Sequence, residues 1–99
     1  GAAGAERMER IMEAFRESKG VIRGLEIAGM VDYSQGVDGL PKSNVLKFLL
    51  KEGGTVILRP SGTEPKLKLY LSLSARNRQE LALLEQRTAE AVERMMEGC

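Results

Sequence analysis

Residues 59–66 of this 99-residue sequence, Arg-Pro-Ser-Gly-Thr-Glu-Pro-Lys, combine groups that can hold an anion. Arg59 offers a planar guanidinium suited to bidentate contact with phosphate. The hydroxyls of Ser61 and Thr63 can donate to anionic oxygens. Two prolines restrict the backbone, and Gly62 is expected to let it turn where a side chain would obstruct it. The exposed amides around Gly62 can form an anion-binding concavity. The segment is therefore a candidate phosphate-binding loop.

The residues around this segment leave two interpretations open. Lys66 and Lys68 follow it at alternating positions, so both are predicted on the polar face of the next strand. A purely structural turn uses the same residue types, and basic side chains beside a turn are often simply solvated. The carboxylate of Glu64 would repel phosphate, so we expect it to pair with a backbone or basic group. The nucleotide P-loop is excluded, because that motif is followed by a helix and here a strand follows.

The composition narrows the chemistry and the class of partner. Histidine is absent and Cys99 is the only cysteine, which excludes His-based catalysis, cysteine zinc sites and an intrachain disulfide. A net charge of +1 argues against a general nucleic-acid or membrane-surface binder. No apolar run approaches the roughly 18–20 residues of a membrane span, and no signal peptide opens the sequence. A free thiol suits a reducing compartment, so we expect a cytoplasmic protein.

The candidate loop lies between two predicted strands. Strand patterns occur at residues 25–33, 44–51, 55–59 and 66–73. The last of these alternates leucine with polar side chains, as expected for a strand with one buried face. Gly53-Gly54 separates the second and third stretches and predicts a hairpin between them. Residues 35–43 are rich in turn-forming residues and predict a loop.

One amphipathic helix is predicted before these strands in the sequence, and another is predicted after them. Apolar residues at helical spacing from Met8 to Phe15 predict a helix over residues 6–18. Asn77 and Glu80 form a capping-box pattern at the start of a second helix that runs to about residue 97.

The order of these elements predicts one domain. The first five residues, Gly-Ala-Ala-Gly-Ala, are predicted to be a flexible lead-in, and residues 6–99 to form the domain. A helix, several strands and a final helix predict an α+β fold, in which both helices cover one face of an antiparallel sheet.

The segment at residues 59–65 resembles the phosphate-binding loop of the α-D-phosphohexomutases, the superfamily of phosphoglucomutases and phosphomannomutases. The flanking sequences at residues 32–33, 40–48 and 66–70 resemble the larger bacterial phosphoglucomutase branch. The resemblance covers residues 6–97, but only the fourth and last domain of the family. It implies a fold like that of the TATA-box-binding protein.

The resemblance also implies a function for the intact enzyme. That enzyme interconverts hexose 1-phosphate and 6-phosphate through a phosphoserine and a bisphosphate intermediate. Its magnesium ion is held by first-domain aspartates outside this chain, and a third-domain loop helps to recognise the sugar. The fourth domain binds the phosphate that is not being transferred. The implied contacts in this sequence are Arg59, Ser61, Gly62, Thr63 and Lys68.

No catalytic residue and no metal ligand of the family falls within these 99 residues, so the isolated domain is expected to be inactive. Its implied partners are a hexose phosphate and the remaining domains of the parent enzyme. The alternatives are a non-catalytic module that binds phosphosugars or proteins, and an interaction domain whose turn is only structural. The preferred hexose, the oligomeric state and the roles of Lys66, Glu64 and Cys99 stay open at this level.

Overall fold

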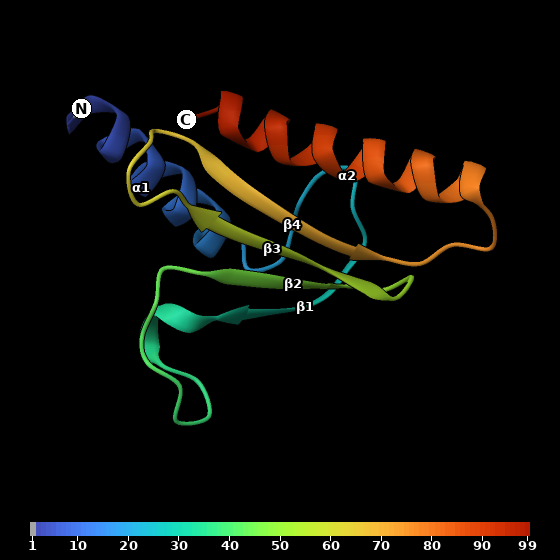
Figure 1. The fold of residues 1–99 in the computed structure, drawn as a ribbon, viewed down its shortest axis with the longest axis horizontal. Helices are drawn as coiled ribbons and strands as arrows, with labels where there is room; N and C mark the ends of the chain where they lie inside the picture. Colours follow the sequence, from blue (N-terminus) through green and yellow to red (C-terminus); the bar gives the residue numbers. More distant parts are fainter. Residues whose placement is uncertain (1) are drawn as a thin grey trace.

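A four-stranded antiparallel sheet and two helices make up the fold. The computed structural model describes residues 2–99. The elements in order are α1 (Ala2–Glu17), β1 (Ile27–Asp32), the 3-10 helix η1 (Tyr33–Gln35), β2 (Leu46–Leu50), β3 (Gly54–Pro60), β4 (Leu67–Leu73) and α2 (Arg78–Glu97). The strands lie side by side in sequence order, β1-β2-β3-β4 (Figure 1). This arrangement confirms the predicted α+β class.

Both helices pack on the same face of the sheet. Buried side chains of α1, α2 and alternate residues of β2 and β3 form a single core cluster. Within this cluster the Phe15 ring of α1 meets the Phe48 ring of β2 with a centroid separation of 6.0 Å. The residues between the buried ones point to the opposite face, because successive side chains of a strand alternate. The sheet therefore has one covered face and one uncovered face.

The predicted hairpin is present and joins β2 to β3. Its register pairs Leu46 with Leu58 and Leu49 with Thr55. The turn consists of residues 51–53, and Gly54 already belongs to β3. Gly54 has a φ of +96°, and a Cβ there would lie 2.4 Å from a backbone oxygen of β4. Glycine is thus required at this position by both backbone conformation and close approach.

The first helix begins earlier than the sequence predicts. Residues 2–5 of the predicted flexible lead-in belong to α1, so that prediction is wrong for them; residue 1 lies outside the described residues. Alanine has the highest helix propensity, which favours this extension. The helix also touches the candidate loop, because a Cβ on Gly4 would lie only 2.5 Å from the Cβ of Pro65. The contact between Gly4 and Pro65 therefore accompanies the additional turn of α1.

The second helix begins as predicted. The Asn77 side chain accepts a hydrogen bond from the Glu80 backbone N–H at 2.9 Å, which confirms Asn77 as the N-cap. The Glu80 carboxylate pairs with the Arg76 guanidinium at 2.8 Å. Within residues 2–99, no helix has the length and apolar character that a membrane span requires.

Candidate functional site

The candidate loop connects the ends of β3 and β4. Ser61 N–H donates to the Lys66 carbonyl at 2.9 Å, which extends the ladder between the two strands. The Ser61 hydroxyl oxygen accepts from the backbone N–H groups of Thr63 (3.4 Å) and Glu64 (3.2 Å). These bonds use the oxygen as an acceptor and leave the hydroxyl proton for donation. The loop thus fixes its own shape and keeps one hydroxyl donor for a ligand.

Two cationic side chains stand next to this loop on the uncovered face of the sheet. Arg59 of β3 lies directly opposite Lys68 of β4, and both are exposed. Their neighbours Leu58 and Leu69 pair in the same ladder and point to the helical side. Directly opposite residues have Cβ atoms about 4.5–5.5 Å apart, and like charges in such a pair are destabilising. Neither side chain takes part in an ion pair formed within residues 2–99.

Glu64 and Lys66 are joined by a weak contact. Lys66 Nζ lies 3.9 Å from Glu64 Oε2, and both side chains are more than 60% exposed. This confirms that Glu64 pairs with a basic group. An exposed pair at this distance contributes little to stability. The contact also reduces the positive charge that Lys66 offers to a ligand.

Gly62 has no structural requirement for glycine within this chain. It is not among the glycines with positive φ, and a Cβ there would meet no heavy atom within 4 Å. The expectation that a side chain would obstruct the turn is therefore wrong for the isolated domain. The space in front of Gly62 is open, so a ligand can approach its backbone closely.

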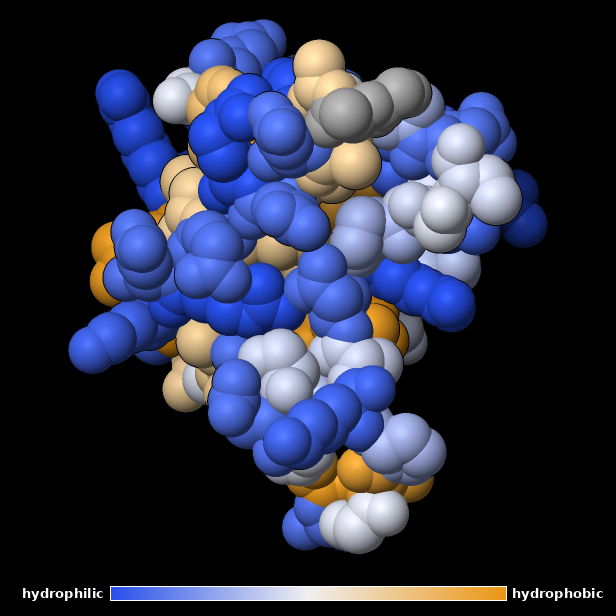
Figure 2. Space-filling model, turned by 90° about the vertical axis from the view of Figure 1, so that its left-hand side faces the viewer, coloured by the Kyte–Doolittle hydropathy of each residue, from blue (hydrophilic) through white to orange (hydrophobic). Residues whose placement is uncertain are grey.

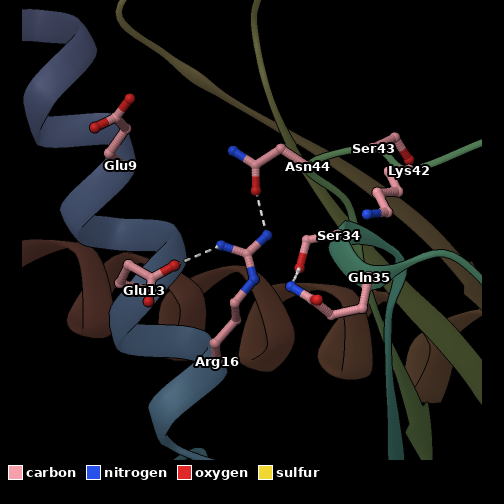
Figure 3. A pocket seen from close by; sticks show the side chains of 8 residues that line it. All are labelled: Glu9, Glu13, Arg16, Ser34, Gln35, Lys42, Ser43 and Asn44. Atoms are coloured by element: carbon pink, nitrogen blue, oxygen red, sulfur yellow. Dashed lines mark hydrogen bonds and ion pairs between the residues drawn. The ribbon is translucent and has the colours of Figure 1, made fainter.

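A second polar site lies beside the loop. A cavity of about 500 Å³ is formed between α1, η1 and residues 42–44 (Figure 3). Arg16 is at its centre: Nε donates to both carboxylate oxygens of Asp32 (3.3 and 3.2 Å) and Nη1 donates to Glu13 (3.0 Å). Its Nη2 donates to Asn44 Oδ1. Arg16 thus connects the helix to the segment that leads into β2.

The Arg16 network changes the acidity of Asp32. Burial raises the pKa of this carboxyl, but hydrogen bonds from Ser34 and Arg16 outweigh burial and hold the pKa below its usual value. Asp32 is therefore ionised at neutral pH. Sequence reasoning missed Arg16, because it lies on the polar face of a helix and 16 positions from its main partner.

The loop borders a further cavity, of about 370 Å³, on the helical side. Its lining comes from residues 60–65, from Ala5, Met8 and Glu9 of α1, and from Asn44. Arg59 and Lys68 do not line it, because they point to the uncovered face. Figure 2 shows this end of the molecule as largely hydrophilic, with small apolar patches that include one at the tip of the segment between η1 and β2. The side chains of Arg59 and Lys68 therefore lie on one side of the loop, and the cavity lies on the other.

The described residues do not form a metal site. No group of three or more carboxylate or thiol side chains within residues 2–99 is placed to hold a metal ion.

Known proteins provide an independent comparison. A family model described as "Phosphoglucomutase/phosphomannomutase, C-terminal domain" matches residues 2–91. Curated relatives named phosphoglucomutase are 41% identical over 93 residues in Staphylococcus saprophyticus and 39% identical over 94 residues in S. aureus strain MSSA476. A third, from S. haemolyticus, is 36% identical over 94 residues. No solved structure matches at a significant level.

These alignments cover most of this chain but a small part of each relative. They include 82–83% of the chain and 17% of the relative's length. The family model likewise accounts for nearly all of the described residues. The chain therefore belongs to the phosphoglucomutase/phosphomannomutase family, in which it corresponds to the C-terminal domain.

Proposed function

We propose that this domain binds the phosphate group of a hexose phosphate, with Arg59, Ser61, Gly62, Thr63 and Lys68 as the contacts. The main support is the facing pair of Arg59 and Lys68, which has no carboxylate partner among the described residues. Two like charges placed opposite each other cost stability, and an anion bound between them removes that cost.

Each proposed contact supplies a different kind of interaction. The Arg59 guanidinium can donate two parallel hydrogen bonds, which fixes the orientation of the phosphate, whereas Lys68 adds a point charge. The Ser61 hydroxyl retains a proton for donation, and the Thr63 hydroxyl adds a second donor. The open backbone at Gly62 lets its N–H approach a phosphate oxygen.

The activity of the whole protein is part of this proposal. The relatives are named phosphoglucomutase, which supports an enzyme that interconverts hexose 1-phosphate and 6-phosphate. In the proposed mechanism a phosphoserine and a magnesium ion are supplied by other domains, and a bisphosphate intermediate forms. This domain holds the phosphate that is not transferred and thereby positions the sugar. The proposed setting is the cytoplasm, where the free thiol of Cys99 stays reduced.

A titration of the isotope-labelled 99-residue chain with glucose 6-phosphate, followed by NMR, tests the proposed contacts. The amide signals of Ser61, Gly62 and Thr63 are expected to shift first, with a dissociation constant of about 1 mM, because one domain supplies only one wall of the site. Arg59→Ala should abolish these shifts. The matched control Arg23→Ala removes an exposed arginine elsewhere and should leave them unchanged. Shifts that persist in the Arg59→Ala variant would refute the assignment.

A further inference from the structure

The cavity between α1 and the candidate loop contains a donor and an acceptor that the proposed phosphate site does not use. These are the Asn44 amide and the Glu9 carboxylate, which both line this cavity and the larger one beside it. In Figure 3, which draws the lining of that larger cavity, the Asn44 amide nitrogen lies on the side of that group away from Arg16, and Glu9 projects from α1 across from it. Two polar groups of opposite hydrogen-bonding character therefore border one cavity.

The orientation of the Asn44 amide is determined by Arg16. A guanidinium carries only donors, so the Asn44 atom that meets Arg16 must be the oxygen. The amide nitrogen is left with two N–H donors. Arg16 is itself held by Asp32 and Glu13, and its side chain is only 15% exposed. The donor at the cavity wall is therefore fixed by a chain of contacts that reaches back into α1.

Ser61, Gly62 and Thr63 border this cavity from the loop, but the charged side chains on the rest of its wall do not suit a phosphate. Glu9 and Glu64 both line it, and neither Arg59 nor Lys68 does. Carboxylates accept hydrogen bonds and repel anions, whereas an uncharged hydroxyl group both donates and accepts. A carboxylate beside an amide N–H can therefore bind two adjacent hydroxyl groups. The carboxylate accepts a hydrogen bond from one hydroxyl, and the amide N–H donates a hydrogen bond to the other.

We propose that Glu9 and Asn44 bind hydroxyl groups of the sugar ring whose phosphate is held at the loop. This inference rests on the proposed function and adds a contact of this domain to the sugar itself. Gly62 lines the cavity and has no side chain, and a Cβ there would meet only open space. A ligand can cross the loop at this residue, with its phosphate toward Arg59 and its ring toward α1.

The test compares two ligands of the 99-residue chain that share a phosphate monoester and differ in the sugar. Glucose 6-phosphate is expected to bind about tenfold more tightly than methyl phosphate, because two added hydrogen bonds to the ring contribute that much. Glu9→Ala and Asn44→Ala should each reduce the preference to about threefold or less. Glu9→Ala should also strengthen methyl phosphate binding slightly, because a nearby negative charge is removed.

Two control variants separate a loss of sugar contacts from a general effect of removing a polar side chain. Glu6→Ala removes another exposed carboxylate of α1 that does not line the cavity, and Gln35→Ala removes an amide that lines only the neighbouring cavity. Both should keep the full preference for glucose 6-phosphate. Equal affinity of the wild-type chain for the two ligands, or an unchanged preference in Glu9→Ala, would overturn the inference and leave the phosphate site intact. No binding of either ligand would overturn the proposed function and this inference with it.

Discussion

Arg16→Ala is expected to lower the free energy of unfolding of this domain by about 2–3 kcal/mol. The substitution removes four hydrogen bonds from one side chain to three partners. Arg16 donates to both oxygens of Asp32, to Glu13 and to Asn44. It also leaves the Asp32 carboxylate, which is only 27% exposed, without its cationic partner.

The size of this stability loss follows from how exposed each partner of Arg16 is. A hydrogen bond to a charged group in a partly buried setting contributes about 1.5–3 kcal/mol, which applies to Asp32. The Glu13 side chain is 61% exposed, so its pair contributes only about 0.2–1 kcal/mol. Asp32 keeps the hydrogen bond from the Ser34 N–H at 2.9 Å, which limits the loss.

Urea denaturation at neutral and acidic pH measures both the size and the origin of this loss. The pKa of Asp32 is lowered in the folded state from its ordinary value of 3.8. A lowered folded-state pKa contributes stability that is present above the unfolded value and is lost as the pH falls through the folded value. The difference in stability between wild type and Arg16→Ala should therefore be full at neutral pH and shrink below pH 3.8.

The control for this prediction is Arg10→Ala, which removes an exposed arginine from the same helix. It should change stability by less than about 0.5 kcal/mol. In thermal unfolding, the Arg16 variant should melt about 10–20 °C lower than wild type, given the size of the domain. A loss no larger than that of the control, or a difference that does not depend on pH, would refute the reasoning.

Three further substitutions test other parts of the structure. Gly54→Ala should lower the free energy of unfolding, measured by urea denaturation, by more than about 2 kcal/mol, because its Cβ would collide with the backbone of β4. Gly53→Ala should lower it by about 1 kcal/mol, because only the positive φ opposes a side chain there. Gly62→Ala should leave the free energy of unfolding within about 0.5 kcal/mol of wild type and weaken phosphate binding. An unchanged dissociation constant would contradict the proposed close approach of the phosphate to the Gly62 backbone. In a full-length enzyme, Arg59→Lys should lower kcat/KM more than Lys68→Arg, because only the first loses a bidentate donor; equal losses would contradict this.

Local patterns in the sequence determine much of this fold. The alternation of residues 66–73 predicts a strand with one buried face, and the structure contains that strand as β4, Leu67–Leu73. Asn77 is predictable as a helix cap, because its partner Glu80 is three residues away. The hairpin between β2 and β3 follows from the glycines between two apolar stretches. In each case the deciding interaction is between residues close in the sequence, so periodicity and residue type suffice.

The sequence also identifies the loop at residues 59–65 as the most distinctive segment. It does so because hydroxyl, glycine, proline and guanidinium groups occur together in a short stretch. What these residues face could not be derived in the same way. The antiparallel register places Arg59 directly opposite Lys68, and a shift of one residue would have separated the two charges onto different faces.

Only the tertiary structure decides which distant groups meet around that loop. Gly4 packs against Pro65 across 61 positions, which extends α1 to the loop. Arg16 joins Asp32 and Asn44 across 16 and 28 positions and so orients the amide at the cavity wall. Such pairs carry no local periodicity and depend on how the helix crosses the sheet. The packing of α1 on the sheet, a nonlocal property of the whole core, therefore sets the surroundings of a loop that local sequence alone can identify.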